Sequence, residues 1–197
     1  KLRDCIAEAK ANNVPNDNIK RMLDKGNQSN VSYESNTYEG YGPSGIAVIC
    51  ETLTDNRNRT VADVRHYFDK YGAGLGNAGC VSWQFEQKGV LIIERGDLDE
   101  DETMMTVLDA GADDFQADED CFQIYTAPED FSAVRDALTE AGFEFAQAEI
   151  QMVPQNTITL ESQEDMAQLR KLLDSLEDND DVQHVWHNWE NEDDYEE

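Results

Sequence analysis

The residues from Val90 to Val153 constrain the fold most, because their apolar positions switch repeatedly between the period of a strand and that of a helix. The pattern predicts strands at 90–94, near Phe115, at 122–126 and at 145–153, and helices at about 100–110 and 128–141. This order, β-α-β-β-α-β, is typical of a ferredoxin-like domain.

A β-α-β pattern precedes this stretch. An apolar strand is predicted at 46–54, and Thr60 is expected to cap the next helix, with Asp63 completing a capping box. Alternation at Val81, Trp83 and Phe85 predicts the second strand.

A matching β-α-β pattern follows the stretch, with a strand at 157–160, a helix capped by Ser162 and a strand at 182–189. Neither unit is complete alone. We therefore expect 46–85 and 157–189 to share one sheet, with the middle domain inserted between them. The last eight residues contain six acids and are expected to form a frayed tail.

The N-terminal residues predict a helical hairpin. Leu2 and Ile6 recur at helical spacing, and a second apolar face around Ile19 ends at Gly26. The polar run at 27–36 predicts a linker. The expected architecture is thus α+β, with an N-terminal helical domain plus two ferredoxin-like α/β domains, one inserted into the other. Its domains are 1–37 (the remainder of the helical domain and the linker), 38–89 with 155–197 (discontinuous), and 90–154 (inserted).

The charge of the chain is divided unevenly. The net charge is −28, yet residues 1–72 hold ten of the fifteen Lys and Arg residues together with ten acids. The remaining residues carry five basic and thirty-three acidic side chains. Because phosphate binding depends on Lys and Arg displacing counterions, a nucleic-acid contact is expected only in the first part of the chain.

The segment 54–60 is the strongest candidate site, since it joins the end of a strand to the start of a helix. Free backbone N–H groups and the helix dipole favour an anion there, and Arg57 and Arg59 would grip phosphate. The alternative is that Asp55 and Asn56 form turns while both arginines pair with acidic residues. The predicted nucleic-acid contacts are Arg57, Arg59, Arg65, Asn56, Asn58, Lys20, Arg21, Tyr41 and Lys70.

No pattern in the sequence predicts catalytic residues, metal ligands or a cofactor. The four cysteines are scattered without a Cys-x-x-Cys pair, and His184 and His187 would point to opposite faces of a strand. The apolar runs are too short to cross a membrane. Since the sequence starts at Lys1 rather than Met, we interpret it as a cytoplasmic protein without its N-terminal segment.

Two stretches closely resemble the signature of the YebC/PmpR family. The first runs from Tyr38-Glu39-Gly40-Tyr41-Gly42-Pro43 through Thr54-Asp55-Asn56-Arg57-Asn58-Arg59-Thr60 and continues with Arg65, Phe68, Lys70 and Leu75-Gly76. The second is Val14-Pro15-Asn16-Asp17-Asn18-Ile19. Ala73 and Cys80 depart from the usual Gly and Ser, and the family's basic Gly-His-Ser-Lys-Trp segment is absent.

The resemblance implies three domains and a role as a probable transcriptional regulator that binds DNA. It also implies a link to translation, since mitochondrial relatives are translational activators and bacterial members have been linked to the ribosome and to relief of stalling at proline runs. We therefore expect a non-enzymatic regulator of gene expression that binds nucleic acid (DNA or RNA) or the ribosome, without a membrane or small-molecule partner. The alternative is an acidic protein-binding adaptor.

Overall fold

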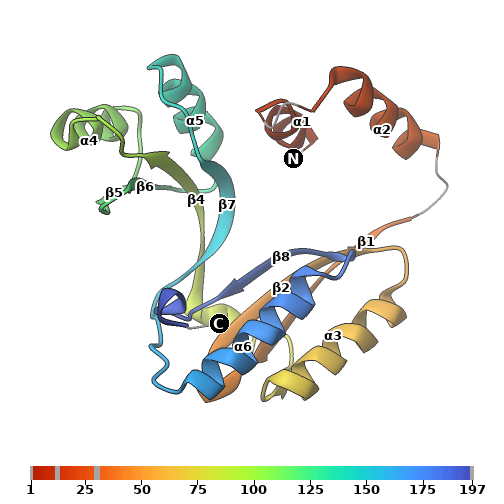
Figure 1. The fold of residues 1–197 in the computed structure, drawn as a ribbon. Coiled ribbons are helices and arrows are strands. Elements are labelled where there is room, and N and C mark those ends of the chain that lie inside the picture. The colour runs from red at the N-terminus through yellow and green to blue at the C-terminus, as the bar shows by residue number, and fades with distance from the viewer. Residues whose placement is uncertain (1, 12–13, 29–31, 196–197) are drawn as a thin grey trace.

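The computed structural model describes residues 2–11, 14–28 and 32–195, and these form two four-stranded sheets and a separate helical pair (Figure 1). The α-helices are α1 (Leu2–Ala11), α2 (Asn16–Gln28), α3 (Arg57–Tyr71), α4 (Glu100–Asp109), α5 (Phe131–Glu140) and α6 (Gln163–Glu177). The strands are β1 (Glu34–Tyr41), β2 (Ala47–Thr54), β3 (Gly74–Leu75), β4 (Phe85–Glu94), β5 (Asp114–Ala117), β6 (Cys121–Thr126), β7 (Gln147–Pro154) and β8 (Val182–His187). This content confirms the predicted α+β class.

The first sheet has the strand order β3-β1-β2-β8, so it joins segments from both ends of the chain. β1 and β2 pair antiparallel from Glu34 opposite Thr54 to Tyr41 opposite Ala47. β8 pairs antiparallel with the other edge of β2. The helices α3 and α6 cover one face, and their contact residues form a core with the strands that includes Val48, Val64, Phe68, Leu169 and Leu172.

The second sheet has the order β5-β6-β4-β7, and all its pairs are antiparallel. The elements follow the chain as β4-α4-β5-β6-α5-β7, which is the predicted sequence of elements. α4 and α5 lie on one face, where Val107 and Leu138 pack against Leu91 and Phe122. No helix of the described residues lies on the opposite face (Figure 1).

α3 begins four residues earlier than the sequence predicted. Asn56, not Thr60, is the N-cap, because its side-chain Oδ1 accepts a hydrogen bond from the backbone N–H of Arg59 at 3.2 Å. Thr60 lies inside the first turn and is buried with Val64 and Phe68. Residues at this four-residue spacing fall on one side of a helix, so α3 is held against the sheet along its length.

The predicted linker at 27–36 is wrong where the structure describes it, since α2 runs beyond Gly26 to Gln28 and β1 begins at Glu34. Residues 29–31 lie outside the described residues. The polar composition concealed the strand, because four residues of β1 (Glu34, Ser35, Asn36 and Thr37) are polar and its buried part starts only at Tyr38.

The predicted strand at 81–85 is also wrong. Ser82–Gln84 form a 3-10 turn, and β4 starts at Phe85. The backbone N–H groups of Val81 and Ser82 both donate to a carboxylate oxygen of Glu39, so they do not join a strand ladder.

The acidic end of the chain is not frayed over residues 190–195. A 3-10 turn occupies Glu192–Asp194, and the Asn191 side chain bonds both the backbone N–H and the carbonyl of Leu160. Residues 196–197 lie outside the described residues.

Candidate nucleic-acid interface

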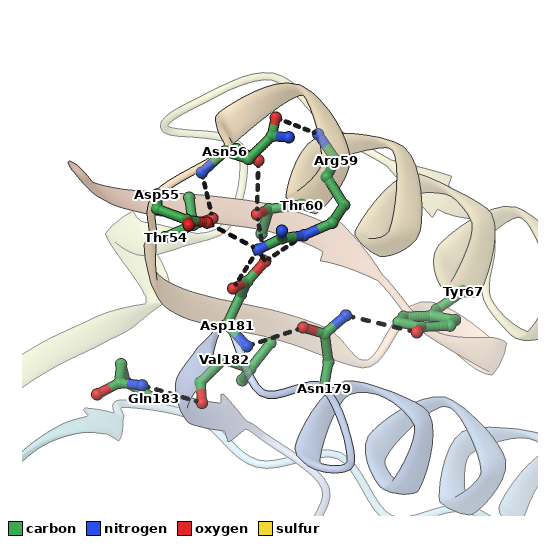
Figure 2. Close-up of polar contacts among 10 residues, drawn as sticks. All are labelled: Thr54, Asp55, Asn56, Arg59, Thr60, Tyr67, Asn179, Asp181, Val182 and Gln183. Carbon is green, nitrogen blue, oxygen red and sulfur yellow. Dashed lines mark hydrogen bonds and ion pairs between the residues drawn. The ribbon is translucent and has the colours of Figure 1, made fainter. Parts of the chain in front are cut away.

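The loop between β2 and α3 is fixed by side chains at both of its ends (Figure 2). The hydroxyl of Thr54 accepts a hydrogen bond from the backbone N–H of Asn56 at 2.9 Å, and Asn56 in turn caps the helix. The N-terminus of α3 is therefore held at the end of β2, in the strand-to-helix arrangement that the sequence predicted.

Arg59 is engaged by two carboxylates. Its Nη2 atom lies 2.9 Å from each oxygen of Asp181 and 3.1 Å from Oδ1 of Asp55 (Figure 2). For this arginine, the geometry matches the alternative interpretation, in which the loop arginines pair with acidic residues. Arg59 exposes 49% of its side chain, but its two carboxylate partners offset its positive charge at the surface.

Asp181 holds the loop against the start of β8. It accepts a hydrogen bond at 2.7 Å from the hydroxyl of Thr60, which is fully buried. Burial alone would raise the pKa of Asp181, but the hydrogen bonds from Thr60 and Arg59 outweigh it and lower that pKa. The carboxylate is thus ionised at neutral pH and can pair with the cationic Arg59.

Arg57 differs from Arg59 because it has no carboxylate partner among the described residues. It is exposed, yet it lies three residues before Thr60, which puts it on the side of α3 that faces the sheet. There it approaches the hydroxyl of Tyr38 on β1 without forming a hydrogen bond of normal geometry. Burial raises the pKa of Tyr38, and the positive charge of Arg57 offsets part of this rise.

Two side-chain atoms of β1 are buried without a hydrogen-bond partner in the described part of the chain. The Tyr38 hydroxyl and the Nδ2 atom of Asn36 are buried without a hydrogen bond, although Tyr38 exposes only 9% of its surface. Buried polar groups are normally hydrogen-bonded, so each such atom needs an explanation. The backbone N–H groups of Arg57 and Asn58 likewise have no acceptor among the described residues, as is usual in a first helical turn.

Arg65 extends the positive surface along α3, and Asn58 adds a neutral amide on the same side. Both are exposed, and they lie seven residues apart, close to two full turns of helix, so they share one side. The structure therefore brings together Asn56, Arg57, Asn58 and Arg59 at the helix start, with Arg65 farther along the same helix.

The other predicted contacts lie elsewhere. Lys70 is in the last turn of α3, with its Nζ atom 4.6 Å from the ring centre of Tyr71. Tyr41 is at the far end of β1, where its hydroxyl donates to the carbonyl of Cys80 at 3.0 Å. Lys20 and Arg21 are exposed on α2, which Figure 1 shows apart from α3.

Sequence reasoning missed Tyr38 and Asp181 as parts of this site. Tyr38 lies on a strand that the polar composition concealed. Asp181 is 122 positions from Arg59, and nothing in the sequence pairs these two residues.

The described residues offer no other obvious chemical centre. Among them, no group of three or more His, Cys, Asp and Glu side chains is placed to hold a metal ion. No helix in the described part of the chain is long and apolar enough to span a bilayer.

Comparison with known proteins gives consistent matches. Residues 33–189 match the family model described as the TACO1/YebC second and third domain. Two proteins called probable transcriptional regulatory proteins, from Ruminiclostridium cellulolyticum and Acetivibrio thermocellus, are each 54% identical over 181 residues. These alignments cover 90% of this chain and 73% and 75% of the relatives.

A solved structure also matches. The crystal structure of a conserved hypothetical protein from Aquifex aeolicus superposes with a TM-score of 0.85 and 40% sequence identity, covering 96% of this chain and 79% of the other. The resemblance inferred from the sequence motifs is therefore confirmed, and the chain belongs to the TACO1/YebC family.

Proposed function

We propose that this chain is a non-enzymatic regulator of gene expression that binds nucleic acid, with the first turn of α3 as a phosphate contact. The observation that carries this proposal is the position of Arg57. It has no carboxylate partner among the described residues, and it lies beside backbone N–H groups without acceptors and near the buried hydroxyl of Tyr38. A phosphate oxygen would accept hydrogen bonds from the Arg57 guanidinium and from these backbone N–H groups at once.

Arg59 has a supporting role in this proposal. Its pairing with Asp181 and Asp55 fixes the loop, so the donors of Arg57 and Asn58 keep their positions when no ligand is bound. Preorganised donors bind an anion with a smaller loss of conformational entropy than mobile ones. The other predicted contacts lie away from the loop, so they would require a nucleic acid that extends along α3 or reaches α2. They stay predictions and are Arg65, Lys70, Lys20, Arg21 and Tyr41.

RNA, including RNA of the ribosome, suits this charge distribution better than long duplex DNA. The basic residues lie mainly before position 72, and thirty-three of the forty-three acids lie beyond it. An extended duplex would meet these acids, whereas a short or folded strand can contact the positive part alone. The names of the relatives favour transcription, so DNA must be tested beside RNA.

We further propose a discontinuous ferredoxin-like domain with a second one inserted into it, as the sequence suggested. The pairing of β2 with β8 supports it. The boundaries expected at 38 and 90 move to 34 and 85, because β1 spans Glu34–Tyr41 and β4 spans Phe85–Glu94. On this account the protein acts in the cytoplasm on macromolecules, without a cofactor or a small-molecule substrate.

The test compares Arg57→Gln with Lys171→Gln, an equal loss of charge on the outer side of α6. Binding of labelled single-stranded RNA, duplex DNA and purified ribosomes is measured for both variants. We expect Arg57→Gln to weaken binding to RNA or ribosomes about tenfold while Lys171→Gln stays within about twofold. Equal affinities for the two variants on every ligand would contradict the proposal. A loss confined to duplex DNA would favour transcription over translation.

A further inference from the structure

A cleft of about 560 Å³ lies between the two sheets, on the side of each that carries no helix. One wall is the bare face of the second sheet, with Val90, Tyr125 and Glu149 among its residues, and the other is β8, with His184 and Trp186. β7 and β8 are the outermost strands of their sheets (Figure 1), and residues of both strands line the cleft. Outermost strands present backbone groups that can pair with a further strand.

Glu149 is held in place by its neighbours on β7. The side-chain amides of Gln147 and Gln151 both donate to its Oε1 atom, at 2.7 and 2.8 Å. Its Oε2 atom has no hydrogen-bond or ion-pair partner among the described residues, and no Lys or Arg is among the described residues that line the cleft. The carboxylate is therefore oriented, half-buried and without a cation.

The other charged groups near the cleft already have partners. Glu192 pairs with Arg170, and His187 lies 3.8 Å from the same carboxylate. Lys88, on the same face of β4 as Val90, has its Nζ atom 3.3 Å from Oε2 of Glu86. Glu149 consequently provides the uncompensated charge of this cleft within the described residues.

Aromatic rings in the cleft are suited to cations. The rings of His184 and Trp186 stack on β8 with centres 5.2 Å apart and an interplanar angle of 13°. The ring of Tyr125 already has the Lys88 Nζ atom 5.9 Å from its centre. Guanidinium groups stack on aromatic rings better than ammonium groups do, so arginine suits these rings better than lysine.

We propose that this cleft binds an extended, arginine-rich segment of a partner protein, which adds to the free edge of β7 and places a guanidinium group on Oε2 of Glu149. Strand addition supplies backbone hydrogen bonds, and side chains at alternate positions of the added strand enter the cleft. The strongly acidic residues beyond position 72 attract such a segment over a longer range. This site is separate from the phosphate contact on α3.

The test uses a fluorescein-labelled peptide of six Arg-Thr repeats and the same peptide with citrulline in place of arginine. Binding is measured by anisotropy for the wild type, Glu149→Gln and Glu140→Gln. Glu140 is exposed at the end of α5, on the other side of the second sheet, so both variants lose one negative charge. Thermal melts show whether either variant has lost its fold.

We expect Glu149→Gln to bind the arginine peptide about tenfold more weakly and Glu140→Gln to stay within about twofold of the wild type. The citrulline peptide should bind weakly to all three, and the arginine peptide should shift the NMR amide signals of β7 and β8. Equal weakening in both variants, or shifts confined to α4 and α5, would overturn the proposal. The proposal would also be overturned if RNA shifted the NMR amide signals of β7 and β8 and the arginine peptide did not. Arg57→Gln should keep wild-type peptide affinity, and a loss there would contradict separate sites.

Discussion

Arg59 and Asp181 join two distant parts of the chain, with Nη2 of Arg59 2.9 Å from each carboxylate oxygen of Asp181. This contact ties the first turn of α3 to the residue before β8. One of the two arginines at the candidate site is thereby a structural element, and the other, Arg57, has no carboxylate partner among the described residues.

Replacing Asp181 by Asn should destabilise the protein. The loss should be about 1–2 kcal/mol, mainly from the weakened hydrogen bond to the buried Thr60 hydroxyl, since exposed ion pairs contribute little. Urea unfolding of Asp181→Asn and of the exposed neighbour Asp180→Asn measures it. Equal stabilities of the two variants at pH 7 would argue against a structural role for Asp181.

The same substitution should reduce the dependence of stability on pH in acid. The folded state lowers the pKa of Asp181, so its stabilising contribution is present above the ordinary value of 3.8 and is lost as the pH falls through the lowered value. The difference in unfolding free energy between wild type and Asp181→Asn should therefore shrink below about pH 4. A difference that stays constant down to pH 2 would show that the charge of Asp181 is not what matters.

Glu39 should be a second acid-sensitive support. It is buried, and its carboxylate accepts backbone N–H bonds from Gly79, Val81 and Ser82 at 2.8–2.9 Å. Burial raises its pKa, but these hydrogen bonds outweigh that effect and lower the pKa below 4.5. Because the folded pKa is lowered, the contribution of Glu39 is also lost only as the pH falls below that range.

Glu39→Gln should cost about 1–3 kcal/mol at pH 7, because an amide NH₂ group would face N–H donors. Glu34→Gln, at the exposed start of the same strand, is the matched control. Hydrogen exchange at Val81 and Ser82 should accelerate in Glu39→Gln alone. Unchanged exchange at these amides would contradict the role of the carboxylate.

Gly40 should not tolerate a side chain. A Cβ atom there would lie 2.6 Å from Cε1 of the buried Phe68 and 2.9 Å from the carbonyl oxygen of Gly74. Gly40→Ala should therefore cost about 1–3 kcal/mol by overpacking. If the ring is the main obstacle, the double variant Gly40→Ala/Phe68→Leu should lose less stability than the two single variants together. Simple additivity would assign the cost to the Gly74 backbone instead.

The sequence predicted elements well where apolar residues recur, as in α6 with its Ser162 cap. It failed where one distant side chain determined the local structure. The carboxylate of Glu39 takes the N–H groups that a strand at 81–85 would need. Half of β1 is polar, because its first residues lie at the exposed end of the sheet.

The candidate site, too, could be predicted from the sequence only in part. The strand-to-helix junction and its arginines follow from composition and position, but the different contacts of Arg57 and Arg59 do not. That difference depends on Asp181 and Tyr38, which approach the loop from β8 and β1 and are brought there only by the pairing of these strands with β2. Local patterns carry no information on such contacts.

The most direct test of the account is the salt dependence of RNA binding by the wild type, Arg57→Gln and Arg59→Gln. If Arg57 contacts a phosphate, the slope of log K against log salt concentration should be smaller in magnitude by about 0.7 to 1 in Arg57→Gln than in the wild type. Arg59→Gln should keep the wild-type slope and lose stability instead, since Arg59 is bound to Asp55 and Asp181. Identical slopes for the wild type and Arg57→Gln would contradict the central claim.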